Sequence, residues 1–123
     1  MGNIHTSGED YLEAILVLFN RHGEVRSVDI ARELGVTKPS VSNAMKVLIK
    51  GSFIKMDENG FITLTEDGRY VAEKIYEKHL VLTEWLKSLG VDEKVSEQDA
   101  CKIEHVISDE SFSALKAHIK AQG

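Results

Sequence analysis

Residues 27–51 read S-V-D-I-A-R-E-L-G-V-T-K-P-S-V-S-N-A-M-K-V-L-I-K-G, and this stretch decides the fold. Apolar residues recur at helical spacing in its first eight positions and again over 41–49. Gly35 and Val36 form a tight turn between the two runs. Pro39 stands in the first turn of the second helix, where its missing N–H costs little. Helix, short turn and helix together predict a helix-turn-helix.

The flanking segments complete a winged form of this motif. Residues 7–22 predict a preceding helix, with Ser7 as its N-cap and Gly23 at its end. Past residue 51, the runs F-I-K-M and F-I-T-L surround the polar turn D-E-N-G, which predicts a β-hairpin. This order of elements is that of a winged helix-turn-helix, whose third helix enters the major groove of DNA.

The second half of the chain predicts helices only. A long helix runs from a cap at Thr65 to about Leu89, a further helix begins near Ser96, and a last one spans about 111–121. We therefore expect a mainly α fold with a small β-hairpin wing. Its winged helix-turn-helix domain covers 1–70, and a helical domain covers 71–123.

This second half is rich in large apolar side chains, more than so short a segment needs for its own core. They predict a homodimer, which would present two recognition helices to half-sites about 34 Å apart. The alternative is that all of them belong to the intramolecular core. The residues are Ile75, Leu82, Trp85, Leu86, Leu89, Val106, Ile107, Phe112, Leu115 and Ile119.

Composition and charge limit the function. The 123 residues are 42% hydrophobic and 28% charged, which is typical of a globular domain and excludes disorder as the main state. No apolar run reaches the length of a membrane span and no signal peptide opens the chain, so we expect no membrane association. The single cysteine cannot form an internal disulfide, which favours the cytoplasm.

The net charge of −5 argues against general polyanion binding, but the charges are unevenly placed. Between Val36 and Met56 every charged residue is a lysine, which indicates a confined anionic partner. We expect hydroxyls and an amide of the third helix to contact base edges, and lysines to neutralise phosphates. The alternative is that these residues form only the solvent-exposed face of an ordinary helix. The candidates are Thr37, Lys38, Pro39, Ser40, Ser42, Asn43, Lys46, Lys50 and Lys55.

A second motif, D-A-C-K-I-E-H over 99–105, carries metal-ligand chemistry. Helical spacing puts Cys101, Glu104 and His105 on one face, and a thiolate, a carboxylate and an imidazole are ligands of transition metals. Three further candidates lie elsewhere, at Asp10, Glu13 and His79. Each has a simpler interpretation. Asp10 could belong to a helix start, Glu13 could be a solvated charge, and cysteine and histidine could merely pack in a core.

Several segments together resemble the diphtheria-toxin-repressor family, which are metal-activated transcriptional repressors for iron or manganese. They are E-D-Y-L-E at 9–13, D-I-A-R-E-L-G-V-T-K-P-S-V-S at 29–42, His79 before G-V-D-E-K at 90–94, and D-A-C-K-I-E-H-V-I-S-D at 99–109. The resemblance extends from about Ser7 to about Ala117. The chain is similar to the short two-domain members of the family, such as the manganese transport regulator.

The resemblance implies a homodimer that binds double-stranded operator DNA when loaded with metal and controls metal-uptake genes. It makes the helix from Thr37 the recognition helix and the 71–123 segment the metal-binding and dimerisation domain. It also makes metal ligands of Asp10, Glu13, His79, Cys101, Glu104 and His105.

The ligand set mixes two types within that family. Cys101 is typical of iron-responsive members, whereas Asp10 and Glu13 match manganese regulators, and Thr83 stands where longer members carry an accessory glutamate. Thiolate favours softer ions than Mn²⁺ and carboxylates favour hard ones, so Fe²⁺ is slightly favoured over Mn²⁺. Six ligands could serve one six-coordinate ion or a pair of ions.

Metal would then act as a clamp between the DNA-binding half and the dimerisation half, by binding the DNA-competent state more tightly. One rival is a winged-helix dimer that senses an organic ligand or oxidation of Cys101. Another is a metalloenzyme with an open coordination position. No general base or substrate pocket is evident in the sequence, so we expect no enzyme and no small organic substrate.

Overall fold

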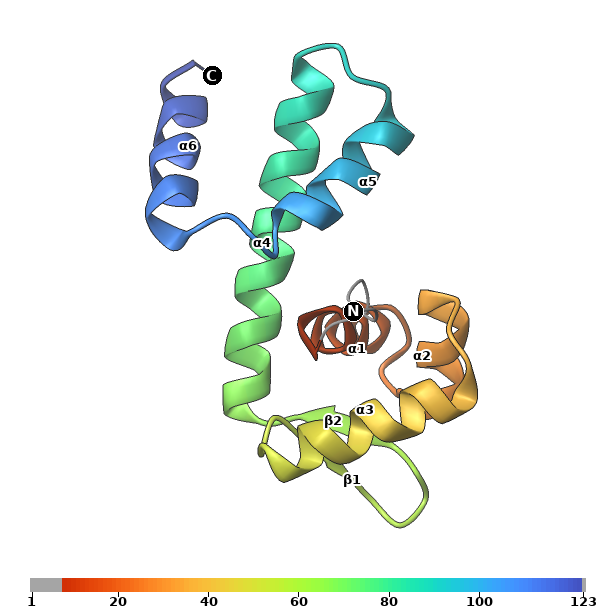
Figure 1. Cartoon of the computed structure of the whole chain (residues 1–123). Coiled ribbons are helices and arrows are strands. Elements are labelled where there is room, and N and C mark those ends of the chain that lie inside the picture. Colours follow the sequence, from red (N-terminus) through yellow and green to blue (C-terminus); the bar gives the residue numbers. More distant parts are fainter. Residues whose placement is uncertain (1–7, 123) are drawn as a thin grey trace. The chain divides into compact units, whose positions relative to one another are not determined.

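The computed structural model describes residues 8–122, which form six helices and one two-stranded sheet (Figure 1). The mainly α fold with a hairpin wing is confirmed. The chain divides into two compact units, Met1–Glu73 and Lys74–Gly123, here called unit 1 and unit 2, and the boundary falls within α4. In order, the elements are α1 (Gly8–His22), α2 (Ser27–Leu34), α3 (Lys38–Lys50), β1 (Ile54–Met56), β2 (Ile62–Leu64), α4 (Glu66–Ser88), α5 (Glu93–Ile103) and α6 (Asp109–Gln122).

The turn between α2 and α3 is built from local hydrogen bonds. Gly35 ends α2 in the left-handed region at φ 67°, and the N–H of Val36 reaches back to the carbonyl of Ala31 at 3.1 Å. Thr37 then caps α3, because its hydroxyl oxygen accepts the N–H of Ser40 at 3.2 Å. The chain therefore changes direction within a few residues and leaves the first turn of α3 exposed.

The core of unit 1 joins all of its elements. Every helix and both strands contribute buried apolar side chains, and the predicted helical periodicity is met in α1 and α3. The main contributors are Leu12, Ile15 and Leu16 of α1, Ile30 of α2, Val41, Met45 and Leu48 of α3, and Ile54 and Ile62 of the hairpin. This packing fixes α3 against the hairpin, so that both stay in place as one surface.

The hairpin pairs β1 with β2 in antiparallel register, with Lys55 opposite Thr63. Its turn is held by Asp57, whose carboxylate accepts the N–H of Asn59 at 2.8 Å and that of Phe61 at 2.9 Å. Gly60 supplies the left-handed residue of this turn at φ 85°. The D-E-N-G segment thus forms the predicted turn.

Gly68, in the first turn of α4, packs against the hairpin more closely than any side chain would allow. A Cβ at this position would lie 1.9 Å from the carbonyl oxygen of Phe53. The same carbonyl accepts the N–H of Thr65 at 3.0 Å, and the Thr65 hydroxyl caps α4 by accepting the N–H of Gly68 at 3.1 Å. The predicted cap at Thr65 is confirmed, and Gly68 is required by the close approach.

Unit 2 consists of α4 beyond Glu73, α5 and α6, with α5 and α6 on either side of α4 (Figure 1). Its core centres on Leu82, Ala100 and Phe112, one from each helix. Partly buried apolar side chains surround them: Val81, Trp85, Ile103, Ile107 and Leu115. None of the described helices combines the length and the apolar content needed to cross a membrane.

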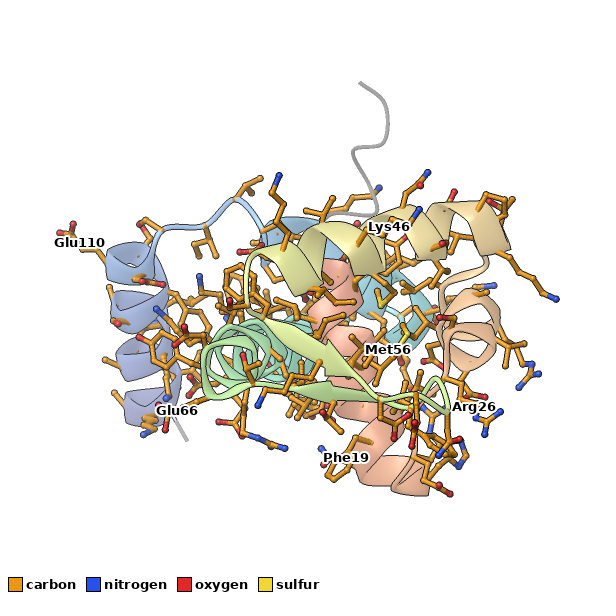
Figure 2. The ribbon with its side chains drawn as sticks, turned by 90° about the horizontal axis from the view of Figure 1, so that it is seen from below. Phe19, Arg26, Lys46, Met56, Glu66 and Glu110 are labelled. Atoms are coloured by element: carbon orange, nitrogen blue, oxygen red, sulfur yellow. The ribbon has the colours of Figure 1, made fainter. Side chains whose placement is uncertain are left out.

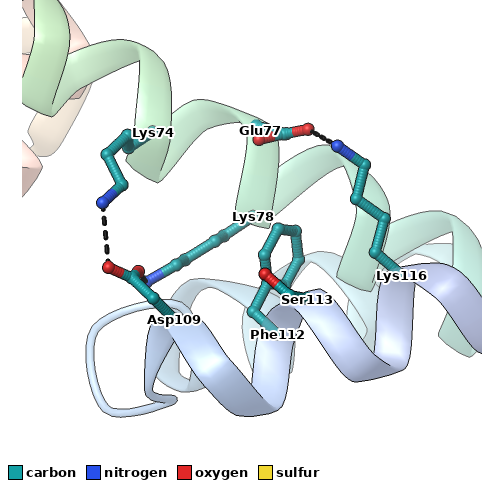
Figure 3. Close-up of a pocket in the computed structure, with 7 residues that line it drawn as sticks. All are labelled: Lys74, Glu77, Lys78, Asp109, Phe112, Ser113 and Lys116. Atoms are coloured by element: carbon teal, nitrogen blue, oxygen red, sulfur yellow. Dashed lines mark hydrogen bonds and ion pairs between the residues drawn. The ribbon is translucent and has the colours of Figure 1, made fainter.

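Ion pairs fasten α6 to α4 (Figure 3). Asp109, the first residue of α6, accepts from Lys74 at 2.9 Å and from Lys78 at 3.1 Å. Further along the same two helices, Lys116 of α6 pairs with Glu77 of α4. Lys78 is largely buried, and its ammonium lies 6.0 Å from the ring centre of Phe112. These residues line an open surface pocket of about 200 Å³.

The helix boundaries of unit 2 differ from the predicted ones. α5 begins at Glu93 and not near Ser96, because Asp92 caps it by accepting the N–H of Lys94 at 3.1 Å. α6 begins at Asp109 and not at Ser111, whose N–H instead donates to the hydroxyl of Ser108 at 3.0 Å. The predicted cap at Ser7 lies outside the described residues.

The end of α5 corrects the expected helical placement of the metal motif. The helix ends at Ile103, so Glu104 is its C-cap and His105 lies in the following turn. Glu104 retains helical backbone angles, φ −59° and ψ −25°, so it still lies one turn beyond Cys101. Cys101 and Glu104 therefore have helical backbone geometry, and His105 follows in the turn.

Candidate metal centre and nucleic-acid interface

Glu104 is the centre of the metal motif in unit 2. Its side chain is fully buried, which is rare for a carboxylate without compensating partners. One oxygen, Oε1, lies 2.8 Å from Nδ1 of His79 on α4. The other, Oε2, lies 3.5 Å from Nε2 of His105. Two imidazoles therefore flank a single carboxylate, one at each oxygen.

The Oε2 atom of Glu104 is buried and accepts no hydrogen bond from any residue that the structure describes. A buried oxygen without a donor loses its hydration without replacement, at a cost of about 1–3 kcal/mol or more for a charged group. A cation at this oxygen would satisfy it. The donor set therefore fits a metal ion.

The ligand atoms of this motif are close enough to share an ion. The thiol of Cys101, a carboxylate oxygen of Glu104 and an imidazole nitrogen of His105 all lie within 4.8 Å of one another. Two ligands of one ion can be separated by at most about 4.6 Å, twice a metal–sulfur bond of roughly 2.3 Å. Small side-chain adjustments would be enough to close this set around an ion.

A further polar atom near this motif was not assigned to it from the sequence. Thr83 lies one helical turn beyond His79 on α4, and it is buried. Its hydroxyl has no hydrogen-bond partner among the described residues. The sequence marks Thr83 only as a departure from the accessory glutamate of longer family members, because a buried hydroxyl leaves no signal in a pattern of spacing.

The remaining two predicted ligands belong to unit 1. Asp10 and Glu13 lie one turn apart on α1, so both carboxylates share one side of that helix. Asp10 is buried and Glu13 is half-buried. The neighbouring Tyr11 is affected by the same surroundings. Burial, and secondarily the charge of Asp10, raise the pKa of the Tyr11 phenol above its usual range. The structure thus groups four predicted ligands in unit 2 and the other two on α1.

All nine predicted DNA-contacting residues are exposed on unit 1. Figure 2 views this face, with Lys46 projecting from α3 and the hairpin alongside. The hydroxyl of Thr37 is already engaged, because it caps α3 and donates to the hydroxyl of Ser40 at 2.9 Å. Ser42 and Asn43 point outward on the next turn and remain the polar groups best suited to base edges.

The lysines of this face are available to an outside partner. Among residues 8–122, none of Lys38, Lys46, Lys50 and Lys55 forms an ion pair. No acidic residue stands between Val36 and Met56 to neutralise them. The positive charge is therefore directed to the exterior, as phosphate binding requires.

Comparisons with known proteins bear on both sites. The family profile described as the N-terminal DNA binding domain of the iron dependent repressor matches residues 3–68. The profile of the iron dependent repressor metal binding and dimerisation domain matches residues 65–121. The two matches together cover nearly the whole chain.

Individual relatives agree with these profiles. The transcriptional regulator MntR of Salmonella typhimurium is 35% identical over 115 residues, 94% of this chain and 73% of the relative. An uncharacterized HTH-type transcriptional regulator of Methanocaldococcus jannaschii is 36% identical over 110 residues, 88% of each protein. The solved structure of the manganese regulator SloR matches at TM-score 0.81 and 27% identity, over 93% of this chain and 54% of that one. The chain thus spans about half the length of that solved protein.

Proposed function

The chain belongs to the iron-dependent repressor family, and from this we propose that it is a metal-dependent transcriptional repressor. In this proposal a homodimer binds double-stranded operator DNA when loaded with Fe²⁺ or Mn²⁺ and controls metal-uptake genes. The observation that carries it is the buried Glu104 carboxylate, with an unsatisfied oxygen among a thiol and two imidazoles.

The proposed ligands come from both units. In unit 2, His79, Cys101, Glu104 and His105 would hold metal. Asp10 and Glu13 of α1 would add carboxylates, which is the assignment that the family resemblance implies. The two oxygens of Glu104 face different imidazoles, so this carboxylate would hold metal together with both His79 and His105. The six proposed ligands could serve one ion or a pair of ions in each copy of the chain.

The donor chemistry favours Fe²⁺ slightly over Mn²⁺. Thiolate suits iron better than manganese, while imidazoles and carboxylates accept either ion. The relative affinity of divalent ions for nitrogen and sulfur ligands also rises from Mn²⁺ to Fe²⁺. Cys101 is the residue on which this preference depends, because the other ligand types are common to iron and manganese sites.

Control of DNA binding would follow from this division of ligands. Unit 1 carries the exposed lysines and α3, whereas most of the proposed ligands lie in unit 2. When bound, the ion would supply positive charge that offsets the negative charge of its carboxylate ligands. Asp10 and Glu13 would then tie α1 to unit 2, and the recognition helices would be restricted to the arrangement that fits DNA. Such a coupling has a typical magnitude of about 1–3 kcal/mol, or roughly 5–150-fold in affinity.

The proposed homodimer would use apolar side chains that unit 2 leaves exposed. Of the apolar residues expected there, Leu82 and Phe112 are buried in the core, whereas Leu89 is 63% exposed and Val106 is 82% exposed. Leu80 on α4 is also exposed. Exposed aliphatic side chains of this number in one small unit fit burial against a second copy.

The proposal also covers the cellular location of the protein and its lack of a catalytic role. A DNA-binding protein that uses a reduced thiol as a ligand is expected in the cytoplasm. The relatives are transcriptional regulators, and no catalytic role is proposed. Their metal-regulator identity also favours a metal signal over an organic ligand or oxidation of Cys101.

The proposal is tested by replacing Glu104→Gln in the full chain. The probe is a DNA duplex enriched from a random-sequence pool by the metal-loaded protein, and binding is measured anaerobically with Fe²⁺ and with chelator. We expect the variant to lose the metal-dependent gain in affinity, because the amide cannot supply the charge of the carboxylate. A matched control is Glu97→Gln on the exposed face of α5, which should respond to metal as the parent does. An undiminished metal response in Glu104→Gln would refute the proposed centre.

A further inference from the structure

Arg26, the residue before α2, differs from the other arginines in its partners. The others are ion-paired: Arg21 with Glu33 at 3.2 Å, Arg32 with Asp29 at 3.7 Å and Arg69 with Glu73 at 3.4 Å. Among residues 8–122, the guanidinium of Arg26 pairs with no carboxylate. It is exposed, and its Cζ lies 4.2 Å from the ring centre of Phe61. A cation without a counter-ion is therefore held against an aromatic face.

The backbone fixes Arg26 beside the hairpin. The carbonyl of the preceding residue, Val25, accepts the N–H of Ile62 at 2.8 Å, and both side chains are buried. The N–H of Arg26 itself donates to the carboxylate of Asp29 at 2.9 Å. Phe61 directly precedes Ile62, so its ring stands next to the guanidinium. Figure 2 shows Arg26 beside the turn end of the hairpin.

The hairpin turn itself is poorly suited to bind phosphate. Its residues Asp57 and Glu58 are acidic, and the turn contains no basic residue. The carboxylate of Asp57 is occupied by two backbone N–H groups, so its charge is partly offset but not reversed. A wing that approaches DNA must therefore take its positive charge from neighbouring residues. Lys55 on β1 and Arg26 are the cations placed to supply it.

We propose that Arg26, held over the ring of Phe61, contacts a backbone phosphate of duplex DNA beside the hairpin wing. A guanidinium that lies over a ring and has no carboxylate partner keeps N–H donors available to a phosphate, whose geometry they match. Stacking also restricts the side chain before binding, which lowers the entropy lost on contact. The inference rests on the proposed DNA-binding function and adds a contact outside the recognition helix.

The test compares Arg26→Ala with the parent, using the metal-loaded full chain and the enriched duplex. We expect binding to weaken roughly tenfold at about 0.1 M salt, as for loss of one charge-assisted hydrogen bond. The slope of log affinity against log salt should fall by about 0.9 for each copy of the chain bound. The preference for the enriched duplex over a mixed-sequence duplex should not change, because a phosphate contact carries no sequence information.

Two further variants separate the contact from a general loss of charge. Arg21→Ala removes an equal charge from the same unit, but from an ion-paired side chain, and should leave both the affinity and the salt slope unchanged. Phe61→Leu keeps the guanidinium and removes its support. It should weaken binding by about two- to fivefold while retaining the salt slope. Circular dichroism and the thermal midpoint establish that each variant is folded.

The possible results are distinguishable. An unchanged salt slope in Arg26→Ala, or an equal loss in Arg21→Ala, would overturn the phosphate contact while leaving the proposed function intact. A parent protein that binds no duplex with or without metal would refute the proposed function, and this inference with it. Should Arg26→Ala unfold, Arg26→Lys decides the point, because it keeps the charge and must retain the salt slope with weaker binding.

Discussion

At the residue scale, Cys101 has the strongest influence on which metal the centre would favour. The carboxylates and imidazoles around it occur in both iron and manganese sites, whereas a thiolate disfavours Mn²⁺. Its position one turn before Glu104 places the sulfur among the other ligand atoms. A single substitution there should therefore alter metal preference without altering the fold.

We predict that Cys101→Glu raises the affinity for Mn²⁺ relative to Fe²⁺ by on the order of tenfold, the usual scale for a change at a metal site. Isothermal titration of the two ions under anaerobic conditions measures this ratio. Cys101→Ser serves as the control, because it removes the thiolate without adding a carboxylate and should weaken both ions. An unchanged ratio in Cys101→Glu would mean that the sulfur does not bind metal.

At the element scale, the contact between α4 and the hairpin depends on Gly68. We predict that Gly68→Ala destabilises the protein by about 1–3 kcal/mol, because the new methyl group would lie 1.9 Å from the Phe53 carbonyl and the helix must shift. This cost exceeds the gain in helix propensity, which is at most about 1 kcal/mol. Thermal unfolding measures the change. Gly8→Ala at the start of α1 is the control, since a Cβ there meets only Leu48 at 3.7 Å.

The ion pairs between α4 and α6 should make stability depend on pH. Hydrogen bonds from Lys74 and Lys78 hold the pKa of Asp109 below its usual range. The charged carboxylate therefore stabilises the fold above the unfolded pKa of about 3.9, and this contribution is lost as the pH falls through the lower folded pKa.

We predict that Asp109→Asn lowers the thermal midpoint at neutral pH, because it leaves the largely buried Lys78 without its counter-ion. The difference from the parent should shrink as the pH is lowered below about 4. Glu110→Gln, at a neighbouring acid that forms no ion pair with any described residue, should show no such difference. A pH-independent effect of Asp109→Asn would contradict the ion-pair interpretation.

Most of the elements could be predicted from the sequence because their signals are local. Periodicity, Pro39 and the D-E-N-G turn are each encoded within a few residues, and α2, α3 and the hairpin lie where these signals place them. The boundaries of α5 and α6 were wrong because capping by Asp92 and Ser108 competes with other polar residues nearby. The requirement for glycine at position 68 could not be predicted, because the close approach to the Phe53 carbonyl arises from tertiary packing.

The candidate site shows the same division between local and tertiary information. The proximity of Cys101 and Glu104 follows from their spacing, and the structure agrees. The pairing of His79 with Glu104 joins a residue of α4 to the C-cap of α5, and the family resemblance, not the sequence pattern, places both residues in one site. Arg26 was missed entirely, because nothing in the sequence indicates that an arginine before α2 would stack on Phe61.

At the scale of the whole molecule, the proposal requires that ligands from unit 1 and unit 2 act together. We predict that Asp10→Asn still binds metal through the unit 2 ligands, more weakly than the parent, but loses the metal-dependent gain in DNA affinity. Metal titration and DNA binding measured on the same preparation separate the two effects. Asp67→Asn, an exposed acid of unit 1, should behave as the parent does. An Asp10→Asn protein with full metal activation would refute the coupling.

Metal control of DNA affinity can be tested in a single comparison. The parent protein is titrated against the enriched duplex, under anaerobic conditions, with excess Fe²⁺, with excess Mn²⁺ and with chelator. We predict that metal tightens binding by roughly 5–150-fold, with Fe²⁺ effective at lower concentration than Mn²⁺. Equal affinity with metal and with chelator would contradict metal control.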